Sequence, residues 1–105
     1  MDGHCLVLIT CGDPAEARGI ARHLVESGLA AGTQIVPIES IYRWQGAMVE
    51  DQEWLMLVKT RRDRFEAIES VVNEMHSYDV PPILMIEIDA AGHSYLAWID
   101  ENVNT

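Results

Sequence analysis

Residues Ile35–Thr60 read IVPIESIYRWQGAMVEDQEWLMLVKT. This stretch predicts a hairpin of two strands, Ile35–Trp44 and Met48–Lys59, joined by a tight turn at Gln45-Gly46. Each arm is longer than the usual strand of about 5–6 residues. We therefore expect the hairpin to project beyond a sheet that is built by a chain of only 105 residues.

Three aromatic residues and one proline decide how this hairpin can be used. Tyr42, Trp44 and Trp54 would be costly to leave in water, at roughly 1.5–3 kcal/mol for each large side chain. We expect a neighbouring chain to cover them. Pro37 cannot donate a hydrogen bond to a neighbouring strand, so the first arm is either an edge strand or carries a bulge.

The residues before the hairpin predict a strand followed by a helix. Residues His4–Thr10 are expected to form a strand, and its run Cys5–Ile9 is apolar on both faces, which indicates burial on two sides. Asp13 is a good N-cap, Pro14 suits the first helical position, and Glu16 can complete a capping box. Gly28 should end this helix, because glycine favours the position after a helix C-terminus.

The residues after the hairpin predict a helix, a strand and a short last helix. Thr60 is expected to cap the second helix, which should end near His76. Its inner face is expected to hold Phe65, Ile68, Val72 and Met75. An apolar strand follows at Ile83–Ile88, and Ser94 is expected to cap a helix over Tyr95–Val103.

This element order predicts the fold class. A strand-helix-strand-strand-helix-strand order with a terminal helix is typical of the α+β, ferredoxin-like split βαβ arrangement. Right-handed crossovers then give an antiparallel sheet in the order 4-1-3-2, with both long helices on one face. We expect residues 1–105 to form a single domain. Because three strands are apolar on both faces, the open face of the sheet should pack on other copies of the chain.

Charge and cysteine content limit the classes of function. The net charge of −10 disfavours a nucleic-acid binder, which needs a basic surface. Four of the seven basic residues lie in Lys59–Arg64, as either a solvated helix start or a local anion site. The sequence contains no apolar run that is long enough to span a membrane.

The first residues predict a cytoplasmic protein. Met1–His4 lacks the basic region of a signal peptide, and the apolar run that follows it is short. If Cys5 and Cys11 both lie on the first strand, they are about 20 Å apart, which is too far for a disulfide between them. Two free thiols fit a reducing compartment.

Six short segments carry a family resemblance. They occur in the family's order across nearly the whole chain, and together the set is specific. They are LVESGLAA (Leu24–Ala31), IVP (Ile35–Pro37), SIYRWQG (Ser40–Gly46), VKT (Val58–Thr60), HSYDVP (His76–Pro81) and YLAWI (Tyr95–Ile99). With these segments the sequence resembles the CutA family of divalent-cation tolerance proteins.

The resemblance implies a compact homotrimer, similar to the PII signalling proteins, in which long hairpins extend the sheets of neighbouring chains. It also implies a non-enzymatic binding or signalling role in tolerance of divalent metal ions, with copper as the reported ligand. The family often has cysteine where Gly32 stands and glutamate where Pro82 stands. Of the copper ligands that the resemblance implies, His76 is the one that carries over cleanly.

Two residues are candidate metal ligands. His76 and Cys11 could hold copper or another divalent cation, weakly or between subunits. The sequence lacks the closely spaced four-ligand pattern of a structural zinc site. The alternatives are structural: His76 would contact the last carbonyls of its helix, and Cys11 would be a small apolar residue at a strand end.

The remaining candidates belong to a cleft or to an interface. Glu39, Arg43, Lys59 and Tyr78 could line a cleft between subunits. As an alternative to the non-enzymatic role, that cleft would bind a small anion or act on one as an enzyme, with His76 beside it. The expected trimer interface comprises Tyr42, Trp44, Trp54, Tyr95 and Trp98. The physiological partner beyond the chain itself is not identified by the sequence.

Overall fold

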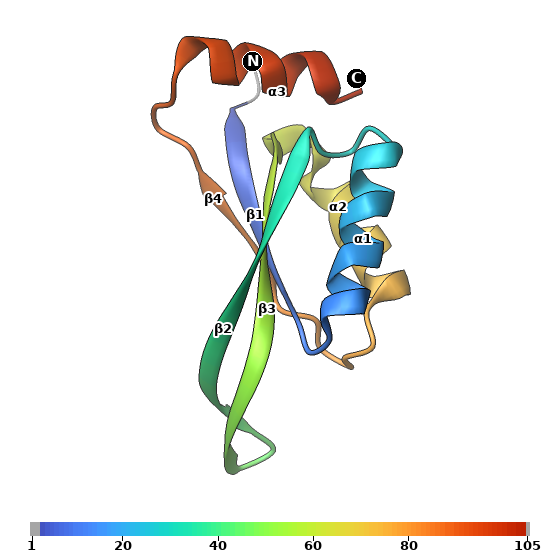
Figure 1. The fold of residues 1–105 in the computed structure, drawn as a ribbon, viewed down its shortest axis with the longest axis vertical. Helices are drawn as coiled ribbons and strands as arrows, with labels where there is room; N and C mark the ends of the chain where they lie inside the picture. The colour runs from blue at the N-terminus through green and yellow to red at the C-terminus, as the bar shows by residue number, and fades with distance from the viewer. Residues whose placement is uncertain (1–2, 105) are drawn as a thin grey trace.

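A computed structural model describes residues 3–104 of the chain. The elements follow the predicted order: β1 (His4–Cys11), α1 (Pro14–Glu26), β2 (Gly32–Trp44), β3 (Ala47–Arg61), the short 3-10 helix η1 (Arg62–Arg64), α2 (Phe65–Met75), β4 (Ile83–Glu87) and α3 (His93–Asn102). The strands form one antiparallel sheet in the order β2-β3-β1-β4. Helices α1 and α2 lie on one side of this sheet, and α3 crosses one of its ends (Figure 1). The predicted α+β class, strand order and helix placement are therefore confirmed.

The β2-β3 hairpin projects from the rest of the molecule (Figure 1). It extends a chain whose longest dimension is 43 Å against 25 and 21 Å for the others. At its tip, Gln45 and Gly46 have φ angles of 50° and 82°. Positive φ at both central residues is the geometry of a type I′ turn, whose twist matches that of the two strands.

Pro37 lies on an edge strand, and the pairing of β2 with β3 is continuous. The register runs without interruption from Gly32 opposite Lys59 to Trp44 opposite Ala47. The edge-strand prediction is thus confirmed, and the alternative of a bulge is wrong. An edge strand leaves one side unpaired, so a residue without an N–H is tolerated there without a break in the register.

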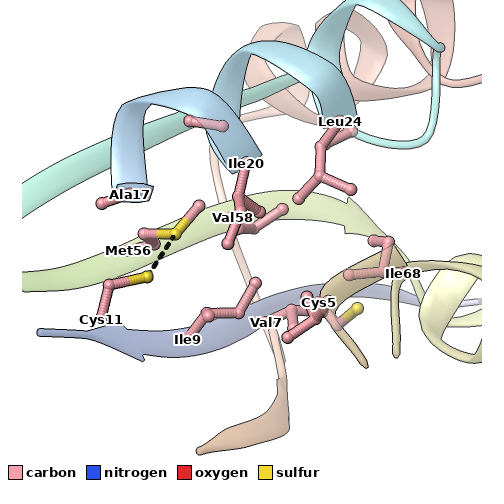
Figure 2. Close-up of a cluster of buried hydrophobic side chains, with 13 residues drawn as sticks. Cys5, Val7, Ile9, Cys11, Ala17, Ile20, Leu24, Met56, Val58 and Ile68 are labelled. Carbon is pink, nitrogen blue, oxygen red and sulfur yellow. Dashed lines mark hydrogen bonds between the residues drawn. The ribbon is translucent and has the colours of Figure 1, made fainter. Parts of the chain in front are cut away.

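The core lies between the sheet and the two long helices. Burial alternates along β1, so every second side chain points towards α1 and α2. Figure 2 shows how this row from β1 meets side chains from β3 and both helices. The fully buried members are Cys5, Val7, Ile9, Cys11, Ala17, Ile20, Leu24, Ala30, Met56, Val58, Ile68 and Val72. The inner face predicted for α2 is confirmed for Ile68 and Val72, which are buried, and for Phe65, which packs against the core. It is wrong for Met75, which lies at the end of α2 and is 41% exposed.

The opposite face of the sheet is only partly covered by its own chain. Leu84 and Ile86, both on β4, are 51% and 47% exposed. Helix α3 covers one end, where Ile99 and Val103 pack on Ala31. At 10 residues, α3 is too short to cover this face alone.

The starts of α2 and α3 differ from the sequence predictions. Thr60 does not cap α2; it lies in β3, fully buried, and its hydroxyl donates a hydrogen bond of 2.7 Å to the carbonyl of Leu29. Helix α3 begins after Gly92 rather than Ser94. At α1 the predicted N-cap is confirmed, because the Asp13 carboxylate accepts a hydrogen bond of 3.0 Å from the backbone N–H of Glu16. The capping box is not formed: the Glu16 carboxylate contacts Ser77 and His76 instead.

Candidate functional site

The chain forms an open cleft of about 810 Å³ where the hairpin leaves the sheet. One wall belongs to β2 and β3, and the other belongs to the segment between α2 and β4. The lining residues are Thr10, Glu39, Ser40, Ile41, Tyr42, Trp44, Asp51, Glu53, Ser77, Tyr78, Asp79, Val80 and Pro82. Cavities of this size commonly hold small organic ligands, which makes the cleft the candidate binding site.

Glu53 and Tyr78 join the two walls of the cleft. The Tyr78 hydroxyl donates a hydrogen bond of 2.7 Å to the Glu53 carboxylate, and Glu53 is only 4% exposed. Burial, followed by this hydrogen bond, raises the pKa of the Tyr78 phenol. Gly12 lies against the same phenol: a Cβ at this position would stand 2.4 Å from the Tyr78 oxygen. A side chain at position 12 would therefore have to displace the Tyr78 phenol from its place beside Glu53.

A second phenol–carboxylate pair lies farther out on the hairpin. The Tyr42 hydroxyl donates a hydrogen bond of 3.0 Å to the Asp51 carboxylate. That hydrogen bond raises the pKa of Tyr42, so the phenol keeps its proton. Both pairs hold an acidic side chain beside an aromatic ring on the same cleft.

The four residues predicted for a cleft do not form one site in this chain. Glu39 and Tyr78 line the cleft within the chain, whereas Lys59 and Arg43 do not. Lys59 pairs with Leu6 and Gly32 at the far end of β3, six residues from Glu53, which is about 20 Å along a strand. The Arg43 guanidinium instead donates a hydrogen bond of 3.4 Å to the carbonyl of Gly46.

This separation changes the charge of the site. Within the described chain, the cleft lining contains four carboxylates and no lysine, arginine or histidine. The lining of this cleft therefore disfavours a small anion, and the anion site expected between subunits stays a prediction. Lys59 is buried, its ammonium group donates a hydrogen bond to the side-chain oxygen of Gln34, and burial lowers its pKa.

A candidate metal-binding group lies next to the cleft. Cys11, Glu16 and His76 each offer one ligand atom, and these atoms lie within 4.8 Å of one another. The structure thus brings the two predicted ligands together and adds Glu16, whose predicted capping role gave no sign of this position. The Glu16 carboxylate lies 3.5 Å from Nδ1 of His76 and also accepts a hydrogen bond from Ser77.

Existing hydrogen bonds of His76 and the protonated thiol of Cys11 oppose metal binding by this group. Nε2 of His76 lies 2.7 Å from the carbonyl of Thr10, and Nδ1 accepts a hydrogen bond of 3.1 Å from the backbone N–H of Tyr78. Both ring nitrogens are therefore engaged in one neutral tautomer. Burial raises the pKa of the Cys11 thiol to about 12, whereas a metal needs the thiolate. In this conformation the three residues fit copper poorly.

The structural roles expected as alternatives to metal binding are found for Cys11 but only partly for His76. Cys11 lies in the core, with Sγ 3.9 Å from Sδ of Met56 (Figure 2), and behaves as a small apolar residue. His76 ends α2, but its partner is the strand carbonyl of Thr10 rather than a carbonyl of its own helix. The imidazole thus ties the end of α2 to the end of β1.

The aromatic residues predicted for an interface fall into three positions. Tyr42 and Trp44 are exposed at the outer part of the hairpin, where they also line the cleft. Tyr95 and Trp98 are exposed on α3, with their rings 5.3 Å apart. Trp54 packs against the core of its own chain, so its burial does not require a neighbour.

The sequence did not single out Asp51, Glu53 or Ser77 as site residues. Glu53 belongs to the acidic run Glu50–Glu53, whose members look alike in the sequence. Side chains alternate between the two faces of a strand, so Glu53 and Asp51 lie on one face and Gln52 and Glu50 on the other. This alternation is the sequence signal that could have separated them. Ser77 follows His76 directly, and only the fold brings it to the Glu16 carboxylate.

Comparison with known proteins gives consistent results. Residues 5–102 match the family model described as CutA1 divalent ion tolerance protein. The divalent-cation tolerance protein CutA of Thermus thermophilus is 48% identical over 98 residues, which covers 92% of this chain and 95% of that protein. The solved structure of the periplasmic divalent cation tolerance protein CutA from Archaeoglobus fulgidus has a TM-score of 0.93 at 40% identity, covering 96% of this chain and 99% of that one.

Proposed function

Because the chain belongs to the CutA1 divalent ion tolerance family, we propose that it acts in divalent metal ion tolerance as a non-enzymatic, homotrimeric binding module. The family supports the role in metal tolerance. The trimer and the absence of catalysis are argued from the exposed apolar residues and from the chemistry of the cleft. A reducing compartment, the cytoplasm, suits its two buried free thiols, Cys5 and Cys11.

The observation that carries the proposal is the apolar surface that the chain leaves open. Leu84 and Ile86 lie side by side with β1 on the face opposite α1 and α2, and Val36 is exposed on the edge strand β2. The hairpin adds exposed Ile41, Tyr42 and Trp44 beyond the sheet. A group of exposed apolar side chains such as this one is typical of an interface between subunits. An edge strand with free backbone groups also allows a neighbouring hairpin to pair with it.

The non-enzymatic part of the proposal follows from the chemistry of the cleft. Its buried carboxylate, Glu53, is held by the Tyr78 hydroxyl, and the nearby thiol of Cys11 is kept protonated by burial. A nucleophile needs a lowered pKa or an adjacent free base. His76 does not provide one, because both of its nitrogens are hydrogen-bonded.

Metal contact in this proposal is weak. Cys11, Glu16 and His76 carry donor types that suit copper, but binding would displace the Tyr78 N–H from His76 and remove the thiol proton. A bound divalent cation would then gather thiolate, imidazole and carboxylate between β1, α1 and the end of α2. Its affinity would rise with pH, because the thiol must lose its proton.

Light scattering and a copper titration test the two halves separately. A mass of about three times the 11.8 kDa chain mass supports the trimer, and a monomer at micromolar concentration overturns it. Calorimetric titration with copper on the wild type and on the His76→Ala, Cys11→Ser double variant tests the metal residues. Identical binding in the two proteins would show that copper binds elsewhere.

A further inference from the structure

The cleft beside the hairpin has two kinds of wall, and both favour a cation. Its aromatic rings belong to Tyr42, Trp44 and Tyr78, and its carboxylates to Glu39, Asp51, Glu53 and Asp79. The lining includes no basic side chain among the described residues. The net charge of −10 adds a long-range attraction for cations.

The hydrogen bonds of the two phenols strengthen this preference. The Tyr42 hydroxyl donates to Asp51, and the Tyr78 hydroxyl donates to Glu53. A phenol that donates to a carboxylate keeps its proton and carries more negative charge on its ring face, which is the part that attracts a cation. Each carboxylate has further lone pairs that remain available to a ligand.

The shape of the site selects an organic cation over a metal ion. A calcium or magnesium ion needs several oxygen atoms converging at about 2.0–2.6 Å. Within the described chain, the group that brings three ligand atoms close together is Cys11, Glu16 and His76, and it includes none of the four cleft carboxylates. The cleft is also open and about 810 Å³ in volume, far larger than a metal site.

We propose that this cleft binds a small organic ammonium ion with alkyl groups on its nitrogen. Alkylated ammonium groups are weakly hydrated, so aromatic rings compete well with water for them, while the carboxylates balance the charge. This inference goes beyond metal tolerance. All the lining residues belong to one chain, so the site needs no residue from a neighbouring subunit.

Choline and its neutral analogue 3,3-dimethyl-1-butanol test the proposal directly. The two probes have almost the same shape and differ in charge. Saturation-transfer NMR on the full chain should show choline binding that saturates in the millimolar range and falls with added salt. The neutral analogue should bind at least about tenfold more weakly, because it lacks the cation–π and charge terms.

Asp51→Asn is the decisive variant. It keeps an oxygen that accepts the Tyr42 hydrogen bond but removes one charge from the cleft. We expect choline affinity to fall about fivefold to tenfold. Glu50→Gln is the matched control: it removes the charge of the neighbouring residue, which does not line the cleft, and choline affinity should change less than about twofold.

Several outcomes would overturn the proposal. They are no choline binding at tens of millimolar, equal binding of the neutral analogue, and equal loss of affinity in Asp51→Asn and Glu50→Gln. Displacement of choline by calcium chloride at matched ionic strength would identify a metal site instead. Light scattering on the same samples keeps the tests distinct: a trimer that binds no choline contradicts this inference alone, and a monomer that binds choline contradicts the proposed assembly alone.

Discussion

The two halves of β3 share one strand and one partner, but they have different surroundings. Residues 54–61 pair with β1, and residues 54–59 of these also pair with β2; this half is mostly buried. Residues 47–52 pair only with β2 and are mostly exposed. A two-stranded ribbon alone is marginally stable in water. The inner half is therefore fixed by helices of its own chain, and the outer half depends on its turn and on whatever covers it.

The largest expected effect comes from the inner half. Leu24→Ala removes a fully buried side chain of α1 that packs over the inner half of the sheet (Figure 2), and should lower the free energy of unfolding by about 2–5 kcal/mol. Guanidinium denaturation measures this directly. Val25→Ala is the control, because its neighbouring side chain is exposed and should cost less than about 1 kcal/mol. Equal effects of the two changes would contradict the core assignment.

The outer half gives a different kind of loss. Trp44→Ala should lower stability by about 2 kcal/mol or more, and the loss should depend on protein concentration because it weakens assembly. Met48→Ala is a control on the same tip, where Met48 is 66% exposed, and should change the melting temperature little. Thermal unfolding and light scattering at several concentrations provide the measurement. Unchanged mass and melting temperature in Trp44→Ala would remove Trp44 from the interface.

The junction of the two halves is tested by Tyr78→Phe. This change leaves the Glu53 carboxylate, which is almost fully buried, without the hydroxyl that donates to it at 2.7 Å. A buried group without its partner costs about 1–3 kcal/mol, which chemical denaturation would detect. Tyr95→Phe serves as the control, because the Tyr95 side chain is exposed on α3. If both variants match the wild type, Glu53 gains no stability from Tyr78.

The same contrast explains how far the sequence predicts the fold. Alternation, the Gln45-Gly46 turn and the Asp13 cap are local signals, and they gave the correct elements and strand order. Thr60 was assigned to a helix cap because threonine is a good N-cap. Its burial depends on the carbonyl of Leu29, a contact between residues 31 positions apart. Local preference was overridden there by tertiary packing.

The candidate site was less predictable for the same reason. Glu53 meets Tyr78 across 25 positions, and His76 meets Thr10 across 66 positions. Their positive charge alone suggested Lys59 and Arg43 as anion-binding residues. The strand register places Lys59 at the end of β3 that is far from the cleft. The sequence therefore identified residues such as Tyr78 and His76, but not the groups that surround them.

The inner half also predicts a dependence on pH. Burial raises the pKa of Cys11 from 9.0 to about 12 in the folded chain, so the unfolded chain loses this proton first. Stability is fully present below pH 9 and falls as the pH rises towards the folded pKa. The wild type should lose stability more steeply than Cys11→Val between pH 9 and 10.5 in denaturant titrations. Parallel curves would show that the thiol ionises equally in both states.

The smallest effects, of opposite sign, come from two glycines. Gly19 in α1 and Gly46 at the hairpin tip both have open space where a Cβ would stand, so alanine meets no clash at either position. They differ in backbone: Gly46 has a φ of 82°, which costs an alanine about 1 kcal/mol, whereas a helical alanine at position 19 gains about 0.5–1 kcal/mol over glycine. Denaturation curves should therefore shift in opposite directions. A neutral Gly46→Ala would mean that the tip turn contributes nothing, so that the outer half is held by its covering partner alone.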